Sequence, residues 1–353
     1  MPRVTLQTIA DRVGVSRMTV SNAFSRPDQL SGDLRARILD AAEQLGYVGP
    51  DPAARALARG TTGAVGILLT DSLRFAFTDE VATTLLASVS EELAPTGLAL
   101  TLLSSTSTGD MIPARDVPMD GALVYSCDTD SAAVDWLRRR KLPLVYVDQE
   151  PVAGVSSVNI DDRGGAVAAA RHIVELGHRR VGIITTSLSG PHGIVEDAIA
   201  AAGGLVGRER VIGWLSVLDE AGITPTVVQA RHTNPEAGEV GLRQILDSGA
   251  DPTAMLCFSD AIAAGVVQYA ISHGLRVPAD LSVVGFDDNP LAQRLRPPLT
   301  TVRQDVEAKG HAAAAALTMA IQRARTGAPP GRAKRLVLPT ELVIRESTAP
   351  PRR

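Results

Sequence analysis

Cysteine, aromatic residues and long apolar runs are all scarce in this sequence. Its 353 residues include only two cysteines, and Phe, Trp and Tyr together make up 3% of the chain. No run of about 18 or more uncharged apolar residues occurs, which argues against a transmembrane helix. The first residues also lack the apolar stretch of a signal peptide. We therefore expect a cytoplasmic protein with no membrane partner.

The two cysteines lie in separate apolar stretches of the sequence. Cys127 falls in ALVYSCD and Cys257 in AMLCFSD. Both stretches resemble buried strands, so free thiols are favoured over a disulfide. The six histidines form no HExxH motif, and no Cys or His cluster has the spacing of a zinc site. We expect neither a metal nor a cofactor.

Lysine is rare as well, with three residues against 32 arginines, and the net charge is −4. The charge is unevenly divided along the chain. Residues 1–60 carry eight Arg and six acidic residues, whereas the rest carries 27 basic and 33 acidic residues. A small basic head on an acidic body fits nucleic-acid binding, but the difference is a weak argument without a motif.

Two short helices joined by a glycine turn are predicted near the start of the chain. The first follows the capping residue Thr5 and ends at Gly14, and the second follows Ser16. Apolar residues recur at helical spacing in both: Leu6, Ile9, Ala10 and Val13, then Val20, Ala23 and Phe24. This pattern leaves Met18, Ser21 and Asn22 facing outward, with Arg17 at the exposed first turn.

A third helix, capped by Ser31 and stopped by Gly46, completes a small shared core. The first two helices are joined by a tight turn, and the second presents polar side chains. This is the helix-turn-helix arrangement, which places a recognition helix in the major groove of DNA. The alternative is a three-helix packing module whose polar face is merely solvated.

The next segment predicts a helix that is too short to be stable alone. Asp51 and Pro52 form a helix start, and AARALAR runs to Gly60. About eight residues are fewer than the roughly 12 to 15 that an isolated helix needs in water. Leu57, surrounded by alanine and arginine, suits a wedge between base steps better than a solvated linker.

From Ala64 onward, short β-rich runs alternate with helical stretches, such as AVGILLT, GALVYS, LPLVYVD and LSVVGFDD. This rhythm predicts an α/β fold of doubly wound parallel sheets, which bind ligands beyond the carboxyl ends of their strands. No GxGxxG, GxxxxGK[ST] or GxSxG motif is placed to serve an enzyme. Asp287 and Asp288 are adjacent on an extended chain, so they point to opposite faces and form a poor acid/base pair.

The segments VTLQTIADRVGVSRMTVSNAF, LSGDLRARILDAAEQLGY and DPAARALARG resemble the LacI/GalR family of bacterial transcriptional regulators. Much of the body, including RPPLTTVRQD, is similar to the effector-binding core of that family. The resemblance implies an N-terminal all-α helix-turn-helix head and an α/β two-lobed core like the periplasmic binding proteins. The expected boundaries are a head at 1–50, a hinge helix at 51–60, a core at 61–346 and a tail at 347–353. Within the core, lobe 1 would comprise 61–159 and 291–323, and lobe 2 would comprise 160–290 and 324–346.

The resemblance also assigns roles in DNA binding. Arg17, Met18 and Asn22 map to the positions that read bases, and Leu57 maps to the hinge leucine that enters the minor groove. We add candidates for phosphate contacts, the ordinary role of hydroxyls and arginines near a nucleic-acid backbone: Thr19, Ser21 and Arg55.

In the core, the family's cleft between the lobes maps to Asp148, Arg210 and Asp287. Carboxylates and a guanidinium suit a polyhydroxylated ligand, so a sugar or sugar derivative is the expected effector. Asp148 and Asp287 could instead cap neighbouring turns, and Arg210 could form a surface ion pair. Four further candidates are Phe77, Thr78, Trp214 and Ser259, although many family members have Asn where Ser259 stands.

The sequence thus predicts a DNA-binding transcriptional regulator, a repressor that binds a pseudo-palindromic operator as a homodimer and works at the nucleoid. A small molecule between the lobes would control its DNA affinity through the interlobe angle. The alternative is a small-molecule sensor with a nucleoside or other metabolite as ligand and no DNA-directed role. An enzyme on a similar two-lobed fold is disfavoured, because no nucleophile, metal set or acid/base pair emerges.

Overall fold

The computed structural model describes residues 4–49, 51–69, 73–105, 110–126, 131–329 and 331–352. The chain divides into two compact units, Met1–Gly63 and Ala64–Arg353. The second of the two cysteines, Cys257, is a buried free thiol, as predicted. Cys127 lies outside the described residues.

The first unit is helical. Thr5 and Thr8 form a capping box, Gly14 makes the left-handed turn at φ +77°, and the Ser16 hydroxyl accepts a hydrogen bond from the backbone N–H of Thr19. These caps fix where the first two helices begin and end. The elements are α1 (Leu6–Val13), α2 (Arg17–Ser25), η1 (Pro27–Gln29), α3 (Gly32–Gln44) and α4 (Pro52–Arg59).

A small apolar core holds the first three helices together. Its buried residues come from each of them: Ile9, Ala10, Val20, Ala23, Ile38, Ala41 and Ala42. Phe24 and Tyr47 pack edge to face against one another at its border, with ring centroids 5.7 Å apart. The predicted apolar stripes of the head are therefore the faces that are buried.

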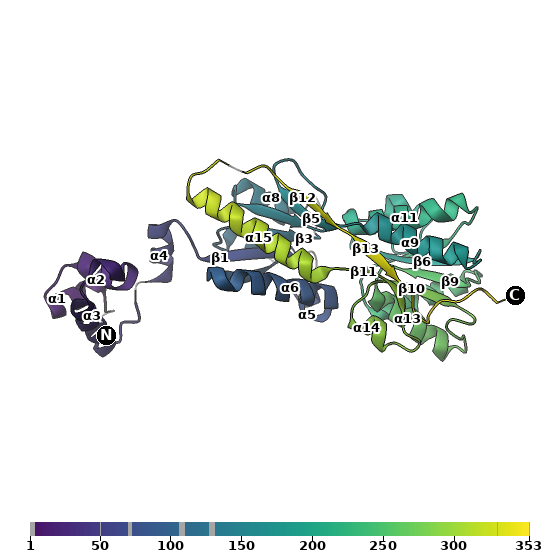
Figure 1. The fold of residues 1–353 in the computed structure, drawn as a ribbon, viewed down its shortest axis with the longest axis horizontal. Coiled ribbons are helices and arrows are strands. Elements are labelled where there is room, and N and C mark those ends of the chain that lie inside the picture. Colours follow the sequence, from purple (N-terminus) through teal and green to yellow (C-terminus); the bar gives the residue numbers. More distant parts are fainter. Residues whose placement is uncertain are drawn as a thin grey trace. The chain divides into compact units, whose positions relative to one another are not determined.

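The second unit contains two sheets, each with helices on both faces (Figure 1). Within the described residues, the first sheet has the order β12-β5-β4-β3-β1-β2, and all its strands are parallel. We call this sheet and its helices the first lobe. Its strands are β1 (Ala64–Leu69), β2 (Ala99–Ser104), β3 (Ala122–Tyr125), β4 (Leu144–Val147), β5 (Ser156–Ile160) and β12 (Arg335–Leu338).

The helices of the first lobe cover its sheet through two apolar layers. One layer packs α6 and α15 against the strands, and the other packs α7 and α8 against the opposite face. The elements are α5 (Phe75–Thr78), α6 (Glu80–Leu93), η2 (Ala94–Thr96), α7 (Pro113–Asp116), α8 (Ala132–Arg139) and α15 (Val306–Arg325).

The other sheet and its helices form the second lobe. Among the described strands its order is β13-β11-β10-β9-β6-β8-β7, parallel except for the edge strands β13 and β7. The strands are β6 (Val181–Thr186), β7 (Gly193–Ile194), β8 (Thr226–Ala230), β9 (Ala254–Cys257), β10 (Ser282–Asp287), β11 (Thr300–Gln304) and β13 (Thr340–Val343). The helices are α9 (Asp162–Glu175), α10 (Ala198–Ala201), α11 (Gly204–Glu220), α12 (Pro235–Asp247), α13 (Asp260–Ser272) and α14 (Pro290–Arg294).

The segments that complete each lobe differ from the predicted ones. Residues 291–323 were expected in lobe 1, but β11 pairs with β10 in the second sheet, and only α15 belongs to the first lobe. Residues 324–346 were expected in lobe 2. Of this segment β13 does pair with β11 in the second sheet, but β12 pairs with β5 in the first sheet. These boundaries depend on which strands pair over long sequence distances. The local pattern of apolar and polar residues does not show that pairing. The chain passes between the lobes after Ile160, after Gln304 and after Leu338.

Residues 347–352, expected as a tail, are instead packed on the second lobe. Ser347 is fully buried, and its hydroxyl accepts from the Thr300 N–H at 2.8 Å and donates to the Val283 carbonyl at 2.6 Å. The Nε2–H of His178 donates to the carbonyl of Ala349 at 2.9 Å. We call residues 347–352 the C-terminal strap, since it ties β10 and β11 together.

Candidate functional site

The surface of α2 presents the side chains that were predicted to read bases. Arg17 is exposed and Met18 is 70% exposed, although an apolar side chain of this size is normally covered. Asn22 is half-buried, and its Nδ2 donates to Gln29 Oε1 at 3.2 Å. The amide of Asn22 is therefore held in one orientation by the turn after α2, with one of its N–H groups already used.

The three candidates for phosphate contacts differ in how they are held. Thr19 and Ser21 are half-buried on α2, and the hydroxyl of Thr19 lies 2.8 Å from the hydroxyl of Ser16. Arg55 is exposed on α4. The hydroxyl of Thr19 thus lies at the amino end of the recognition helix, where its backbone N–H groups favour an anion.

The helix α4 carries the predicted wedge. Leu57 is 87% exposed on this eight-residue helix, and the N–H of Ala54 donates to Asp51 Oδ1 at 3.4 Å as a weak start cap. A leucine so exposed gains nothing from folding in water. Its position is consistent with contact to a partner.

A cavity opens between the two lobes at the carboxyl ends of the parallel strands. Asp148, Arg210, Asp287 and Ser259, all predicted from the sequence, line it together with residues of both lobes. Further polar lining residues come from strand ends and from the connections that follow the strands: Asp79, Ser126, Thr186, Ser187, Arg231, His232, Thr233 and Gln304. This position is the one expected for ligands of doubly wound sheets.

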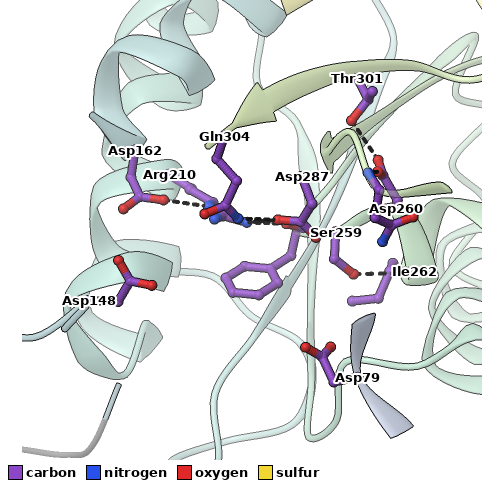
Figure 2. A network of polar contacts seen from close by, with 12 residues as sticks. Asp79, Asp148, Asp162, Arg210, Ser259, Asp260, Ile262, Asp287, Thr301 and Gln304 are labelled. Atoms are coloured by element: carbon purple, nitrogen blue, oxygen red, sulfur yellow. Dashed lines mark hydrogen bonds and ion pairs between the residues drawn. The ribbon is translucent and has the colours of Figure 1, made fainter. Parts of the chain in front are cut away.

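Arg210 lies at the centre of the second-lobe wall (Figure 2). Its Nε donates to Asp162 Oδ1 at 2.8 Å, and its Nη1 lies 3.8 Å from Asp287 Oδ1. The guanidinium carbon is 4.6 Å from the ring centroid of Phe258 and 3.5 Å from that of Phe286, so the charged plane is held between two aromatic rings. These contacts fix the direction in which the fork points.

The carboxylate of Asp287 is almost completely enclosed. Gln304 Nε2 donates to Asp287 Oδ1 at 2.7 Å. Burial raises the pKa of Asp287 to about 7, although the nearby charge of Arg210 acts in the opposite direction. Burial likewise raises the pKa of Asp162 to about 6. The wall therefore holds carboxyl groups that change charge near neutral pH.

Asp148 has a partner that sequence reasoning missed. The ammonium of Lys309, which is fully buried, donates to Asp148 Oδ2 at 2.5 Å and to Gln304 Oε1 at 2.8 Å. Asp148 Oδ1 is buried and has no hydrogen-bond partner among the described atoms. The one signal in the sequence was that Lys309 is one of only three lysines in an arginine-rich chain.

Backbone strain is concentrated at the strand ends that line the cavity. Ser126 after β3, Asp148 after β4 and Asp287 at the end of β10 have φ values of +51°, +50° and +119°. Side-chain-bearing residues seldom adopt such angles, and those that do are often found at ligand sites. The strain turns these side chains toward the space between the lobes.

Three of the weaker candidates are not among the described residues that line this cavity. Phe77 and Thr78 are exposed on α5 and do not line it, whereas Asp79, one residue further, does. Asp79 caps α6 through the Ala82 N–H at 2.8 Å, and burial raises its pKa. Trp214 is 1% exposed within the apolar core beneath α11 and is not among the described lining residues. It therefore offers no stacking surface to a ligand.

Ser259 lines the cavity, but its hydroxyl is already engaged. It caps α13 by accepting from the Ile262 N–H at 3.2 Å. Behind it, the buried carboxylate of Asp260 accepts from Thr301 Oγ1 at 2.5 Å and from the Asn289 N–H at 3.0 Å (Figure 2). Asp260 therefore ties α13 to the loop that follows Asp287, a support that sequence reasoning missed.

No three His, Cys, Asp or Glu side chains in the described ranges are grouped so as to hold a metal ion. None of the described helices has both the length and the apolar character needed to span a bilayer.

Comparison with known proteins matches both parts of the chain. Residues 5–49 match the family described as "Bacterial regulatory proteins, lacI family", and residues 170–348 match the "Periplasmic binding protein-like domain". An HTH-type transcriptional regulator of Mycolicibacterium smegmatis is 38% identical over 369 residues, covering 99% of this chain and 97% of that protein.

Two solved structures are similar over nearly the whole length. The transcriptional regulator CelR in complex with cellobiose is 28% identical with a TM-score of 0.69, covering 98% of this chain and 100% of that one. The lac repressor dimer bound to operator and the anti-inducer ONPF is 25% identical with a TM-score of 0.75, covering 98% and 99%. With a capped recognition helix in its head and a polar cavity between two lobes, this chain belongs to the lacI family of bacterial regulatory proteins.

Proposed function

We propose that this protein is a repressor that binds a pseudo-palindromic operator as a homodimer, under the control of a small polyhydroxylated molecule in the cavity. The observation that carries the DNA part is Leu57, an apolar side chain 87% exposed on a helix too short to be stable alone. A partner helix and a DNA duplex together would cover it, because a leucine inserted between base steps is buried. The lac repressor, a family relative, forms a dimer on its operator.

The test of this part is a gel shift on promoter fragments. Wild type should bind a subset of fragments at low salt, and Leu57→Ala should bind them with about tenfold or greater loss, since a fully buried leucine contributes roughly 1.5–3 kcal/mol. Leu336→Ala, which removes an exposed leucine of β12, serves as the matched control and should bind as wild type does. Equal binding by wild type and Leu57→Ala would remove the hinge role, and no binding by wild type would remove the DNA-binding role.

The proposed effector is a sugar or sugar derivative. Asp148 Oδ1 has no hydrogen-bond partner among the described atoms, and Arg210 and Asp287 add a further donor and a second acceptor, which suits several hydroxyl groups. The cavity volume is about 150 Å³, which is the space that a single benzene-sized ring fills. CelR, a relative, has been solved with cellobiose.

A thermal-shift screen of monosaccharides, nucleosides and organic acids would identify the ligand, because a molecule that binds only the folded state raises the melting temperature. Asp148→Asn should abolish the shift given by a sugar. If only nucleosides shift the melting temperature, the sugar class is wrong and the DNA-binding role is untouched.

We further propose that the protein acts by binding alone, without catalysis, in the cytoplasm at the nucleoid. Each acidic side chain of the cavity has one carboxylate oxygen engaged in support of the structure: Asp79 in a helix cap, Asp148 with Lys309 and Asp287 with Gln304. Recovery of any shifting ligand unchanged after prolonged incubation with the protein would agree with this proposal, and its conversion would contradict it.

A further inference from the structure

A single buried ammonium links the cavity walls of the two lobes. Lys309 and Asp148 belong to the first lobe, whereas Gln304 and Asp287 end strands of the second sheet. Lys309 Nζ donates to both Asp148 and Gln304, and the amide of Gln304 in turn donates to Asp287 at 2.7 Å. We call Asp148, Lys309, Gln304 and Asp287 the interlobe chain.

The placement of Lys309 is costly in two ways. It is fully buried, and it lies in the first turn of α15 after the N-cap Asp305, where the helix dipole disfavours a positive charge. An apolar residue would fill the same space without either penalty. The ion pair is therefore weak evidence for a role in stability and better evidence for a role in orienting its partners.

The hydrogen bonds that the Lys309 ammonium donates determine which carboxylate oxygens remain as acceptors for a ligand. Oδ2 of Asp148 is taken by the ammonium, so Oδ1, which has no partner among the described atoms, is left as the acceptor. With its Oε1 facing Lys309, the amide of Gln304 must direct its Nε2 toward Asp287 Oδ1. The ammonium thus sets the orientation of an acceptor in each lobe.

We propose that Lys309 is a positioning residue of the effector cavity: through Gln304 it ties Asp148 of the first lobe to Asp287 of the second and holds both in the orientation that binds ligand. The idea rests on the proposed function in one respect, that the molecule bound here is the effector. Lys309 does not line the cavity among the described residues, so it acts only through its two partners. If the angle between the lobes changes, either the hydrogen bond from Lys309 to Gln304 breaks or Asp148 moves together with Gln304.

The test is hydrogen–deuterium exchange of the full, unliganded chain, comparing Lys309→Met with wild type. Loss of hydrogen bonds to a charged group should raise exchange about tenfold at residues 144–150 of the first lobe and also at 284–289 of the second. Exchange at 226–230, in β8 of the second lobe, should not change. Lys334→Met, which alters an exposed lysine, is the matched control. A rise confined to 144–150 would mean that Lys309 only packs the first lobe, which overturns the proposal.

A second variant covers the case in which Lys309→Met fails to fold. Gln304→Met cuts the interlobe chain while leaving Lys309 paired with Asp148, so exchange should rise at 284–289 and stay unchanged at 144–150. Where Lys309→Met does fold, adding it to Gln304→Met should give no further rise at 284–289, because the connection is already cut. No rise at 284–289 in Gln304→Met, or a further rise in the double variant, contradicts the proposal. Neither measurement uses DNA or ligand, so each result is independent of the gel shift and the ligand screen.

Discussion

Asp287 and Asp288 are neighbours in the sequence, yet their carboxylates serve opposite sides of the end of β10. Asp287 accepts from Gln304 within the cavity, whereas Asp288 pairs with Arg303 at 2.8 Å and with Arg345 at 2.5 Å. The backbone departs from the extended strand conformation here, with φ +119° at Asp287 and +55° at Asp288. The first carboxylate is available to a ligand, and the second anchors β10 to its neighbours.

The raised pKa of Asp287 predicts a dependence of stability on pH. Its folded pKa of about 7 lies above the ordinary aspartate value of 3.8. The folded protein therefore keeps a proton that the unfolded chain releases, and the resulting stability is present at low pH and lost as the pH rises through about 7. Asp287→Asn mimics the protonated form and should lose less stability between pH 5 and pH 8 than wild type.

Urea unfolding of both proteins at several pH values checks this. The difference between them isolates Asp287 from groups that titrate in both, including His172 and His178, whose pKa values are lowered by burial. A difference that does not vary between pH 5 and pH 8 would show that Asp287 is ionised throughout.

Ser259 is predicted to stabilise α13 without binding ligand through its hydroxyl. Ser259→Ala removes the cap on the Ile262 N–H and should lower the free energy of unfolding by about 1 kcal/mol. Ser259→Asn supplies another capping side chain and should recover most of that loss. Affinity for any sugar found in the screen should stay near that of wild type in Ser259→Ala, measured by calorimetry. A large loss of affinity at unchanged stability would place the hydroxyl on the ligand.

The C-terminal strap should contribute measurably to the second lobe. Ser347→Ala leaves the Thr300 N–H and the Val283 carbonyl buried without their partner, which should cost about 1–3 kcal/mol. Ser272→Ala, a change at an exposed serine, should stay within about 0.5 kcal/mol of wild type. Thermal unfolding of the two variants compares them directly, and equal melting temperatures would mean that the strap is dispensable.

Two variants in the head should distinguish a residue that reads bases from one that contacts the DNA backbone. Asn22→Ala should weaken operator binding by about 1–3 kcal/mol and relax the sequence preference at one position. Arg55→Ala should weaken binding to all sequences alike and reduce the slope of log affinity against log salt by about 1. Titrations at several salt concentrations, on operator and on scrambled DNA, distinguish the two patterns. The same salt slope in wild type and Arg55→Ala would remove the phosphate role.

Local signals predicted the head well because its elements depend on neighbouring residues. Ser16 caps the recognition helix as expected, and Gly14 makes the left-handed turn before it. The cavity was predicted only in part. Asp148, Arg210 and Asp287 were found through the resemblance, but Lys309 lies 161 residues from Asp148, and no local pattern joins the two.

Trp214 shows why a residue type alone misleads. It follows Arg210 by one turn of α11, and both side chains are buried. One turn moves a residue about 5.4 Å along the helix, which here takes it from the cavity into the apolar core. The sequence pattern predicts which face of α11 a residue lies on. Whether that residue reaches the cavity or the apolar core depends on how α11 packs against α9.

The pairing of β12 with β5 affects how the chain folds during translation. Arg335 aligns with Ser157, so β5 stays without this neighbour until about 180 more residues have been made. At about 5–20 residues per second this takes roughly 10–35 s. During that time the nascent first lobe exposes an open strand edge, the feature most prone to aggregation. Slow ribosomes, or a stop before Arg335, would therefore increase the demand for chaperones more than the size of this protein alone would suggest.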